Sequence, residues 1–243
     1  MSASSVNPRR ILSLWLPRLP IDRIQRFLGS AGLGKNNNDP SIVVIKDNNA
    51  LVIHALDEAA GHLGLYIGQP LANARAMCPD LKVFDADVVA DAKTLSDIAD
   101  WCDRFTPLVA LDPPHGLFLD ITGCAHLFGG EAALLQTLVR ALGRQGFAVS
   151  AAIAGTSICA RTLTRQASGT IVADGGEAEA IDRFPVSALG AGEAITTGLR
   201  RAGLKSIGDV ASRSPGEITA RFGARFSTPV SYTHLTLPTK RIV

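Results

Sequence analysis

The sequence lacks the features that mark membrane-spanning and disulfide-rich proteins. No apolar run approaches the roughly 20 residues that a membrane helix requires. The run near the N-terminus follows two arginines, but prolines interrupt it and no small-residue cleavage site follows, so we expect a first strand rather than a signal peptide. The four cysteines form no Cys-x-x-Cys pair, which is typical of reduced thiols in a cytosolic protein. Cys124 and His126 have a ligand-like spacing but stand alone beside a turn, so no zinc site is expected.

The chain also lacks a large excess of positive or negative charge. The net charge of +2 over 243 residues neither demands nor excludes nucleic acid as a partner, because a local basic face can lie on a near-neutral protein. Hydrophobic residues make up 47% of the chain, which argues against general disorder. The length allows one large domain or two to three small ones.

The N-terminal part combines one helix with β-rich runs. "RILSLWL" (10–16) has strand length and ends at prolines. The helix that follows places Ile21, Ile24, Phe27 and Leu28 on one face. The runs "SIVVIK" and "ALVIHAL" are separated by "DNN", which predicts a hairpin. A loop is expected at 34–40, and a short helix and a second helix begun by Pro70 are expected after the hairpin.

The middle of the chain alternates between helix and strand periods. The sequence predicts a long helix at 87–105, followed by two β-runs in "VALDPPHGLFLDITG" at 109–123. It then predicts a helix at 130–146, a strand at 147–155, a helix at 156–168 and a short strand at 169–174. This alternation predicts an α/β unit.

After Gly175 the chain turns to short helices punctuated by glycines. "LGAGEAITTGLRRAGLKSIGDV" resembles a degenerate helix-hairpin-helix, which holds a DNA phosphate on backbone amides at a helix N-terminus. The candidate DNA-binding residues are Gly190, Gly192, Arg200, Arg201 and Lys205. The alternative is a small helical domain with a solvated basic face.

The last residues, "VSYTHLTLPTKRIV", do not continue this helical pattern. "VSYTHLTLPT" corresponds to the translation of a sequencing-adapter-like DNA. We therefore expect residues 229–243 to be an artefactual tail and the natural protein to be longer.

The order of these elements and several motifs resemble the Y-family translesion DNA polymerases. The motifs are "LWLPRLPIDR", "NARAMCPDL", "ADWCDRFTPLVALD" and "GLFLDITGCAHLFGGE". In sequence, these motifs are more similar still to the polymerase-like subunits of bacterial mutasomes. The resemblance implies an α/β palm with a fingers insertion and a small all-α, helix-hairpin-helix-like thumb, without the little-finger domain. The implied ranges are 9–19 and 86–175 for the palm, 20–85 for the fingers and 176–228 for the thumb.

The same resemblance implies that the family's metal-binding acids are replaced. Y-family polymerases hold two divalent metals with an acid on the first strand and an Asp-Glu pair on the palm hairpin. The first-strand acid and its neighbour fall on Trp15 and Pro17, and the Asp-Glu pair falls on His115 and Gly116. An indole, an imidazole and a bare glycine are poor ligands for Mg²⁺.

The family's triphosphate-binding side chains are replaced as well. The fingers Tyr and Arg fall on Glu58 and Gly61, and the palm Lys falls on Ser168. A Glu in this place repels a triphosphate. We therefore expect no catalytic residue, no nucleotide site and no metal or other cofactor, with Mg²⁺ needed only if the chain is an active polymerase after all.

Two carboxylates remain in the hairpin. Asp120 matches a family position that supports the strand, and Asp112 is expected to cap the turn at Pro113. A metal held by Asp112 and Asp120 together would require a shift in the hairpin register.

The resemblance implies a non-catalytic adaptor on damaged DNA, acting in the bacterial cytoplasm and at the nucleoid during damage-induced translesion synthesis and SOS mutagenesis. The implied partners are primer–template DNA, the sliding clamp, an ImuA-type RecA-like protein and an error-prone replicative-type polymerase, contacted mostly through a region after the thumb. Two alternatives stay open: an active error-prone Y-family polymerase with displaced ligands, and a plain DNA-binding module.

Overall fold

The computed structural model describes residues 8–32, 39–214 and 216–218. The expected tail at 229–243 lies outside these residues, as do most of the expected loop at 34–40 and the end of the segment 176–228.

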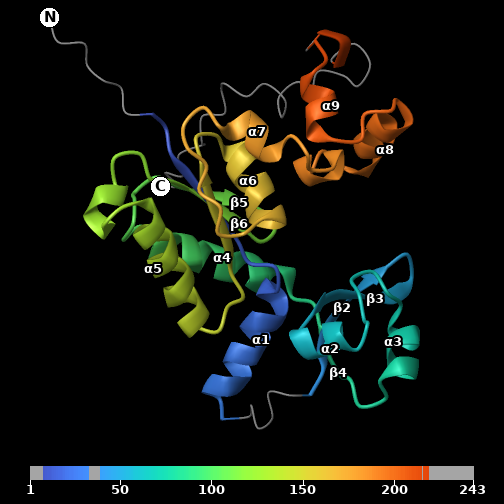
Figure 1. Ribbon diagram of the computed structural model, residues 1–243. Helices are drawn as coiled ribbons and strands as arrows, with labels where there is room; N and C mark the ends of the chain where they lie inside the picture. The colour runs from blue at the N-terminus through green and yellow to red at the C-terminus, as the bar shows by residue number, and fades with distance from the viewer. Residues whose placement is uncertain (1–7, 33–38, 215, 219–243) are drawn as a thin grey trace, which may run out of the picture.

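A four-stranded antiparallel sheet forms the centre of the molecule (Figure 1). Its strands lie in the order β5-β6-β1-β7, with bounds β1 Ile11–Trp15, β5 Val109–Asp112, β6 Gly116–Asp120 and β7 Ser150–Ala154. In the β1–β6 pair, Ile11 lies opposite Asp120 and Trp15 lies opposite Gly116. The strands expected at 10–16, at 109–123 (two runs) and at 147–155 are all confirmed, although β7 begins three residues later than its expected range.

Alternating leucines place the main core on one face of this sheet. Leu12, Leu14, Leu117 and Leu119 are fully buried, and they pack against α4 (Val88–Cys102) and α5 (Glu131–Arg144). The opposite face is covered in part by α6 (Ser157–Gln166), which contacts β1 and β7. The sheet therefore lies between two helical layers, as the period-2 pattern of the strands requires.

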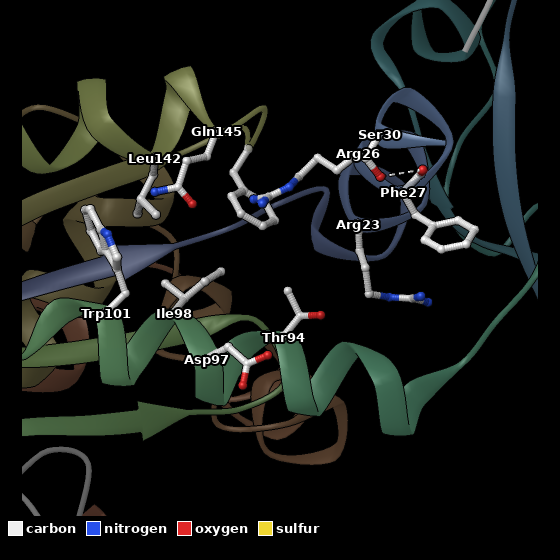
Figure 2. A pocket seen from close by; sticks show the side chains of 11 residues that line it. Arg23, Arg26, Phe27, Ser30, Thr94, Asp97, Ile98, Trp101, Leu142 and Gln145 are labelled. Carbon is white, nitrogen blue, oxygen red and sulfur yellow. Dashed lines mark hydrogen bonds between the residues drawn. The ribbon is translucent and has the colours of Figure 1, made fainter. Parts of the chain in front are cut away.

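Helix α1 (Leu19–Ser30) leaves the end of β1 and runs past the core (Figure 1). Its first turn is buried, but Phe27, expected on the core face, is 68% exposed. The helical period was right, but the buried residues of α1 are all in its first turn, Leu19 to Asp22. The C-terminal half of α1 instead borders an open cleft with α4 and α5 (Figure 2).

The residues between α1 and α4 form a second sheet, which has three strands. Strands β2 (Ser41–Asp47) and β3 (Ala50–Leu56) form the expected hairpin, and β4 (Lys82–Asp85) lies parallel to β2. Asn48 and Asn49 both have positive φ, as a two-residue hairpin turn requires. The expected helices are α2 (Glu58–His62) and α3 (Leu71–Met77). The sequence did not predict β4, because four residues, of which the two end ones are exposed and the two middle ones half-buried, show no clear period.

The C-terminal part is helical. It contains α7 (Glu177–Ile181), a 3-10 helix at Val186–Leu189, α8 (Glu193–Arg201) and α9 (Ile207–Ala211). These elements share a core with α6 that includes Val186, Leu199 and Ile207. The strand expected at 169–174 is wrong: Ile171 forms only an isolated bridge to Ile153. The chain turns away at Asp174–Gly175 before a ladder can form.

A further 3-10 helix that the sequence did not predict spans Ala125–Phe128. Among the described residues, no helix combines the length and hydropathy needed to cross a bilayer.

Candidate functional site

Trp15, His115 and Gly116 meet at one end of the four-stranded sheet. Trp15 lies opposite Gly116 in the β1–β6 pair. The backbone N–H of Leu16 donates to the His115 carbonyl at 2.9 Å. Pro17 lies in the turn that follows, and it precedes α1. Of the four positions expected to replace the metal-binding acids, Trp15, His115 and Gly116 are therefore neighbours in space, and Pro17 follows two residues after Trp15.

Gly116 has no room for a side chain. A Cβ atom built on it would lie 2.8 Å from the backbone oxygen of Asp112 and 3.0 Å from a carboxylate oxygen of the same residue. Contacts this short with backbone do not occur in real proteins, so the β5–β6 turn would have to rearrange. In the described hairpin, position 116 cannot carry a carboxylate.

Two arginines of α6 occupy the space beside this hairpin. Arg161 Nε lies 3.0 Å and Arg165 Nη2 lies 3.6 Å from the same Asp112 oxygen. The guanidinium of Arg165 also lies 5.5 Å from the centroid of the Trp15 ring. The sequence predicted a turn cap at Asp112; in the structure its carboxylate instead pairs with two cations across the sheet.

Burial sets the protonation properties of this cluster. It raises the pKa of Asp112, against the opposing effect of Arg161 and Arg165. Burial and the neighbouring charge of Arg161 lower the pKa of Arg165. Burial also lowers the pKa of His115, and the charge of His54 on β3 acts in the same direction. The cluster thus joins one carboxylate to two guanidinium groups and a neutral imidazole.

The positions expected to replace the triphosphate ligands have structural roles. Glu58 begins α2, and its Oε2 lies 3.4 Å from Arg18 Nη1 at the start of α1. The hydroxyl of Ser168 accepts a hydrogen bond from the backbone N–H of Ala151 at 3.2 Å. Gly61 lies inside α2, where an added Cβ would lie 3.4 Å from a methyl carbon of a neighbouring leucine. A side chain would fit at Gly61, in contrast to Gly116.

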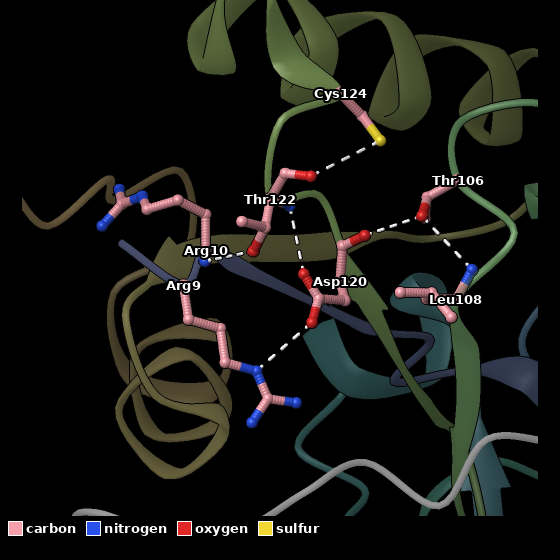
Figure 3. Close-up of polar contacts among 7 residues, drawn as sticks. All are labelled: Arg9, Arg10, Thr106, Leu108, Asp120, Thr122 and Cys124. Atoms are coloured by element: carbon pink, nitrogen blue, oxygen red, sulfur yellow. Dashed lines mark hydrogen bonds and ion pairs between the residues drawn. The ribbon is translucent and has the colours of Figure 1, made fainter. Parts of the chain in front are cut away.

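Asp120 lies at the other end of the same strand (Figure 3). Its carboxylate accepts from Arg9 Nε at 3.2 Å and from the Thr122 backbone N–H at 3.1 Å. Asp112 lies opposite Gly116, and Gly116 is four residues from Asp120 along β6, so the two aspartates are about 13 Å apart along the strand direction of the sheet. They cannot share one metal ion, and the register-shifted metal site considered from the sequence does not fit the described hairpin.

The donor set at this site does not fit the two divalent metals of the family. Hard cations require several oxygen ligands. Here the carboxylate of Asp112 already pairs with two arginines, and that of Asp91, whose charge acts on His115, pairs with Arg23. Within residues 8–32, 39–214 and 216–218, no three His, Cys, Asp or Glu side chains are grouped so as to hold a metal. The site offers cation–carboxylate pairing and an indole surface.

The candidate DNA-binding residues lie along the α8 hairpin. Gly190 (φ +66°) ends the 3-10 helix, and Gly192 (φ +89°) is the N-cap of α8. Arg200 and Arg201 end α8, about 12 Å from Gly192 by helical rise along the backbone. The Arg200 side chain reaches back, and its Nη2 donates to Ser187 Oγ at 3.2 Å in the 3-10 helix that Gly190 ends. Lys205 is exposed at the start of α9. The five residues follow one edge of the C-terminal part rather than a single pocket.

Sequence reasoning missed Arg161 and Arg165. They are four residues apart on a predicted helix, which places both on one face of it. In the structure this face lies next to Gly190, where an added Cβ would lie 3.8 to 3.9 Å from both guanidinium groups. That spacing was the available signal, but the sequence does not show which element the face meets.

Comparison with solved structures defines the class of fold. The chain superposes on an insertion ternary complex of Dbh DNA polymerase with a TM-score of 0.74 and 14% identity, covering 93% of this chain and 68% of that one. A Y-family DNA polymerase chimera gives a TM-score of 0.76 with 12% identity, covering 96% and 70%. The mixed α/β fold with two sheets is therefore that of Y-family polymerases, as predicted.

Sequence comparison gives the family. The model of the impB/mucB/samB family matches residues 24–165, and the chain belongs to this family. It is 45% identical over 162 residues to protein ImuB of Caulobacter vibrioides, covering 66% of this chain and 35% of that protein. It is 32% identical over 180 residues to DNA polymerase IV 2 of Mesorhizobium japonicum, covering 71% and 43%. The chain thus spans less than half the length of these relatives.

Proposed function

We propose that this chain is part of a non-catalytic Y-family homologue that acts as an adaptor on damaged DNA during translesion synthesis. The observation that carries the proposal is the steric closure at Gly116, where the family pattern expects a metal-binding Glu. Trp15 and His115 beside it supply no oxygen ligand. The similarity to ImuB and to DNA polymerase IV supports a role connected with DNA damage.

In this proposal each region has a separate task. Residues 9–19 and 86–175 form the palm, 20–85 the fingers and 176–228 the thumb. The thumb holds DNA through the backbone amides at Gly190 and Gly192 and through the basic end of α8. The palm and fingers keep the shape that surrounds a primer–template without adding nucleotides to it.

The adaptor role also requires protein partners. We propose the sliding clamp, an ImuA-type RecA-like protein and an error-prone replicative-type polymerase. Their contacts fall mainly on the part of the protein that follows the thumb, because the matched region covers 35% of the ImuB relatives. The bacterial cytoplasm, with association to the nucleoid, is the proposed location.

Primer extension tests the loss of catalysis. The chain is incubated with primer–template DNA, all four nucleotides and Mg²⁺ or Mn²⁺, beside an active Y-family polymerase as positive control. We expect no incorporation above background, because within residues 8–32, 39–214 and 216–218 no His, Cys, Asp and Glu side chains are grouped so as to hold the two metals that the reaction needs. Incorporation that disappears on Asp120→Ala would overturn the adaptor proposal in favour of an active polymerase with displaced ligands.

DNA binding is tested separately. Changing Arg200, Arg201 and Lys205 together to Ala removes three cations and should lower the slope of log affinity against log salt by up to about 3. The matched control, Arg140→Ala with Arg144→Ala on the exposed side of α5, should leave binding unchanged. Unchanged affinity in the triple variant would remove the assignment of this face. Complete loss of binding would instead favour a plain DNA-binding module.

A further inference from the structure

Arg161 and Arg165 on α6 form a pair of cations that shares a single carboxylate. Both guanidinium groups approach the same oxygen of Asp112, with Arg161 Nε at 3.0 Å and Arg165 Nη2 at 3.6 Å. Among the described residues, Asp112 is the only acid whose charge acts on Arg165, and the charge of Arg161 repels it. The two arginines and the carboxylate therefore carry a net positive charge at neutral pH.

The hydrogen-bonding capacity of this pair is largely unused. Arg161 Nε has no hydrogen-bond acceptor within residues 8–32, 39–214 and 216–218, although Asp112 lies beside it. A guanidinium offers its donors in a planar fork that matches the oxygens of a carboxylate or a phosphate. The side chains of Arg161 and Arg165 are 31% and 24% exposed, so an anion from solvent can reach them. Two adjacent cations that are accessible and short of acceptors are suited to hold an anion.

The arginine pair lies against the glycine turn that precedes α8. Helix α6 lies between the central sheet and this turn (Figure 1). An added Cβ on Gly190 would lie 3.8 Å from Arg165 Nη1 and 3.9 Å from the Arg161 guanidinium. Arg200, from the end of α8, reaches the 3-10 helix that Gly190 ends, where its Nη2 donates to Ser187 Oγ at 3.2 Å. Three cations from two helices thus converge on one turn.

We propose that Arg161 and Arg165 bind a phosphate group of the DNA strand that the α8 hairpin holds. This inference rests on the proposed function, which places DNA at Gly190 and Gly192, and it adds a contact on α6 to those on α8. One phosphate pairs with the two guanidinium groups, and Arg200 meets a neighbouring phosphate of the same strand. Phosphates repeat at short intervals along a nucleic acid, so cations on adjacent elements can hold one strand together.

Asp112 has a specific part in this proposal. In the absence of DNA its carboxylate neutralises part of the arginine charge, and it competes with a phosphate for the same donors. Pairs of guanidinium and phosphate are charge-assisted and often bidentate. Removing the carboxylate therefore increases the attraction for a phosphate, whereas a purely structural ion pair would give no such gain.

Other interpretations of the arginine pair explain less. Burial and the charge of Arg161 both lower the pKa of Arg165, so neutralising Asp112 does not account for the second cation. An acidic protein segment would pair with the same groups. However, the basic end of α8 extends the positive charge along this edge, and a repeating phosphate backbone uses such an arrangement.

The test measures binding of a fluorescein-labelled primer–template to the full chain by anisotropy at several salt concentrations. Arg161→Gln combined with Arg165→Gln should weaken binding at least about fivefold and lower the slope of log affinity against log salt by about 1. The matched control is Arg140→Gln with Arg144→Gln, an exposed pair with the same spacing on α5, which should change affinity by less than about twofold. Melting temperatures check that each variant folds.

Asp112→Asn should have the opposite effect. It should tighten DNA binding by about twofold to fivefold, because the competing carboxylate is removed while both arginines remain. The gain should disappear when Arg161→Gln and Arg165→Gln are added. A folded Asp112→Asn variant that binds DNA no more tightly than the unchanged chain would overturn the proposal.

Failure of this inference is distinguishable from failure of the proposed function. If the variant of Arg200, Arg201 and Lys205 loses affinity while the α6 double variant binds DNA like the unchanged chain, the contact on α6 is overturned and that on α8 stands. If the unchanged chain binds no DNA, both are overturned.

Two further ligands identify the source of the anion. If the α6 double variant loses affinity for inorganic phosphate in calorimetry but not for DNA, the arginines take free phosphate, and the DNA contact is overturned. The same holds if oligoglutamate binds the unchanged chain more tightly than DNA does and loses affinity in the double variant. That result would assign the pair to an acidic protein segment.

Discussion

The two faces of the four-stranded sheet are built differently although they share every strand. One face presents fully buried leucines to α4 and α5. The other presents Ser13, Trp15 and Gly116 together with Ile11 and Ala152, which belong to a second buried apolar cluster with α6. Thr164 Oγ1 of α6 donates to the Ser13 carbonyl on this face at 3.1 Å. The leucine face is an apolar core throughout, whereas the Trp15 face joins a core to the positions at which we propose that metal ligands are replaced.

The difference shows that the Trp15 face is filled by a charged cluster. Arg165 packs over the indole and pairs with Asp112, and a guanidinium carries its charge at neutral pH. Under the proposed function, this fixed cation stands where the family pattern places metal ions. We infer that Arg165 and Asp112 close the surface around Trp15, beside the second core that packs on α6.

The sharpest test of this division compares Leu14→Ala with Trp15→Leu, two neighbours on opposite faces. Leu14→Ala should lower the free energy of unfolding by about 2–5 kcal/mol, because it opens a cavity in the buried core. Trp15→Leu should cost less than about 1.5 kcal/mol, since the half-buried indole is replaced by another apolar group. Urea unfolding measures both. Equal losses would mean that the Trp15 face is as important for stability as the core.

The next effect concerns Gly116 and Gly61, two glycines at positions where the family has functional side chains. Gly116→Ala should destabilise the chain by about 2–3 kcal/mol, because the new Cβ meets the Asp112 carbonyl. Gly61→Ala should be neutral or stabilise by up to about 1 kcal/mol, since α2 has room and Ala favours helix. Thermal and urea unfolding check the pair.

A Gly116→Ala variant that unfolds like the unchanged chain would contradict the steric argument at this turn. The same result would weaken the adaptor proposal, because a carboxylate could then be accommodated at position 116.

A smaller effect is expected for the ion pair between Asp112 and Arg165. A double-mutant cycle with Asp112→Asn and Arg165→Gln should give a coupling energy of about 1 kcal/mol, because both side chains are largely shielded from water. The exposed Lys93–Asp97 pair on α4 serves as the control, with a coupling of about 0.3–0.5 kcal/mol. If the two couplings are the same, the cluster on the Trp15 face is merely a surface ion pair.

The sequence predicted the leucine face far better than the Trp15 face. Alternation in "ILSLW" and "GLFLD" fixes which residues turn inward, and a helical period over fifteen residues identifies α4. Such local patterns are sufficient for the core. They did not show β4, and they wrongly predicted a strand at 169–174, because short segments depend on neighbours that periodicity does not reveal.

The site was predictable only in part. The family resemblance singled out Trp15, His115 and Gly116, and the β1–β6 register makes Trp15 and Gly116 neighbours, while the assignment of these positions to metal binding stays a prediction. The pairing of Asp112 with α6 depends on how the helix crosses the sheet, which is a long-range property. The exposure of Phe27 has the same origin, because a helical face is buried only where another element covers it.

The smallest expected effect is a pH dependence of stability that arises from His115 on the Trp15 face. Burial lowers the pKa of His115 below its ordinary value of 6.5, so the folded chain resists protonating this imidazole. Below about pH 6.5 the unfolded state binds the proton more readily, and the contribution of His115 to stability, present above that pH, is lost as the pH falls.

His115→Gln should therefore lose less stability than the unchanged chain when the pH is lowered from about 7.5 to about 5.5. Melting temperatures at the two pH values measure this difference. His62→Gln, on the exposed end of α2, is the control and should follow the unchanged chain. If His115→Gln follows it as well, the imidazole is solvated in solution, and the Trp15 face is more open around His115 than the half-buried position of this residue indicates.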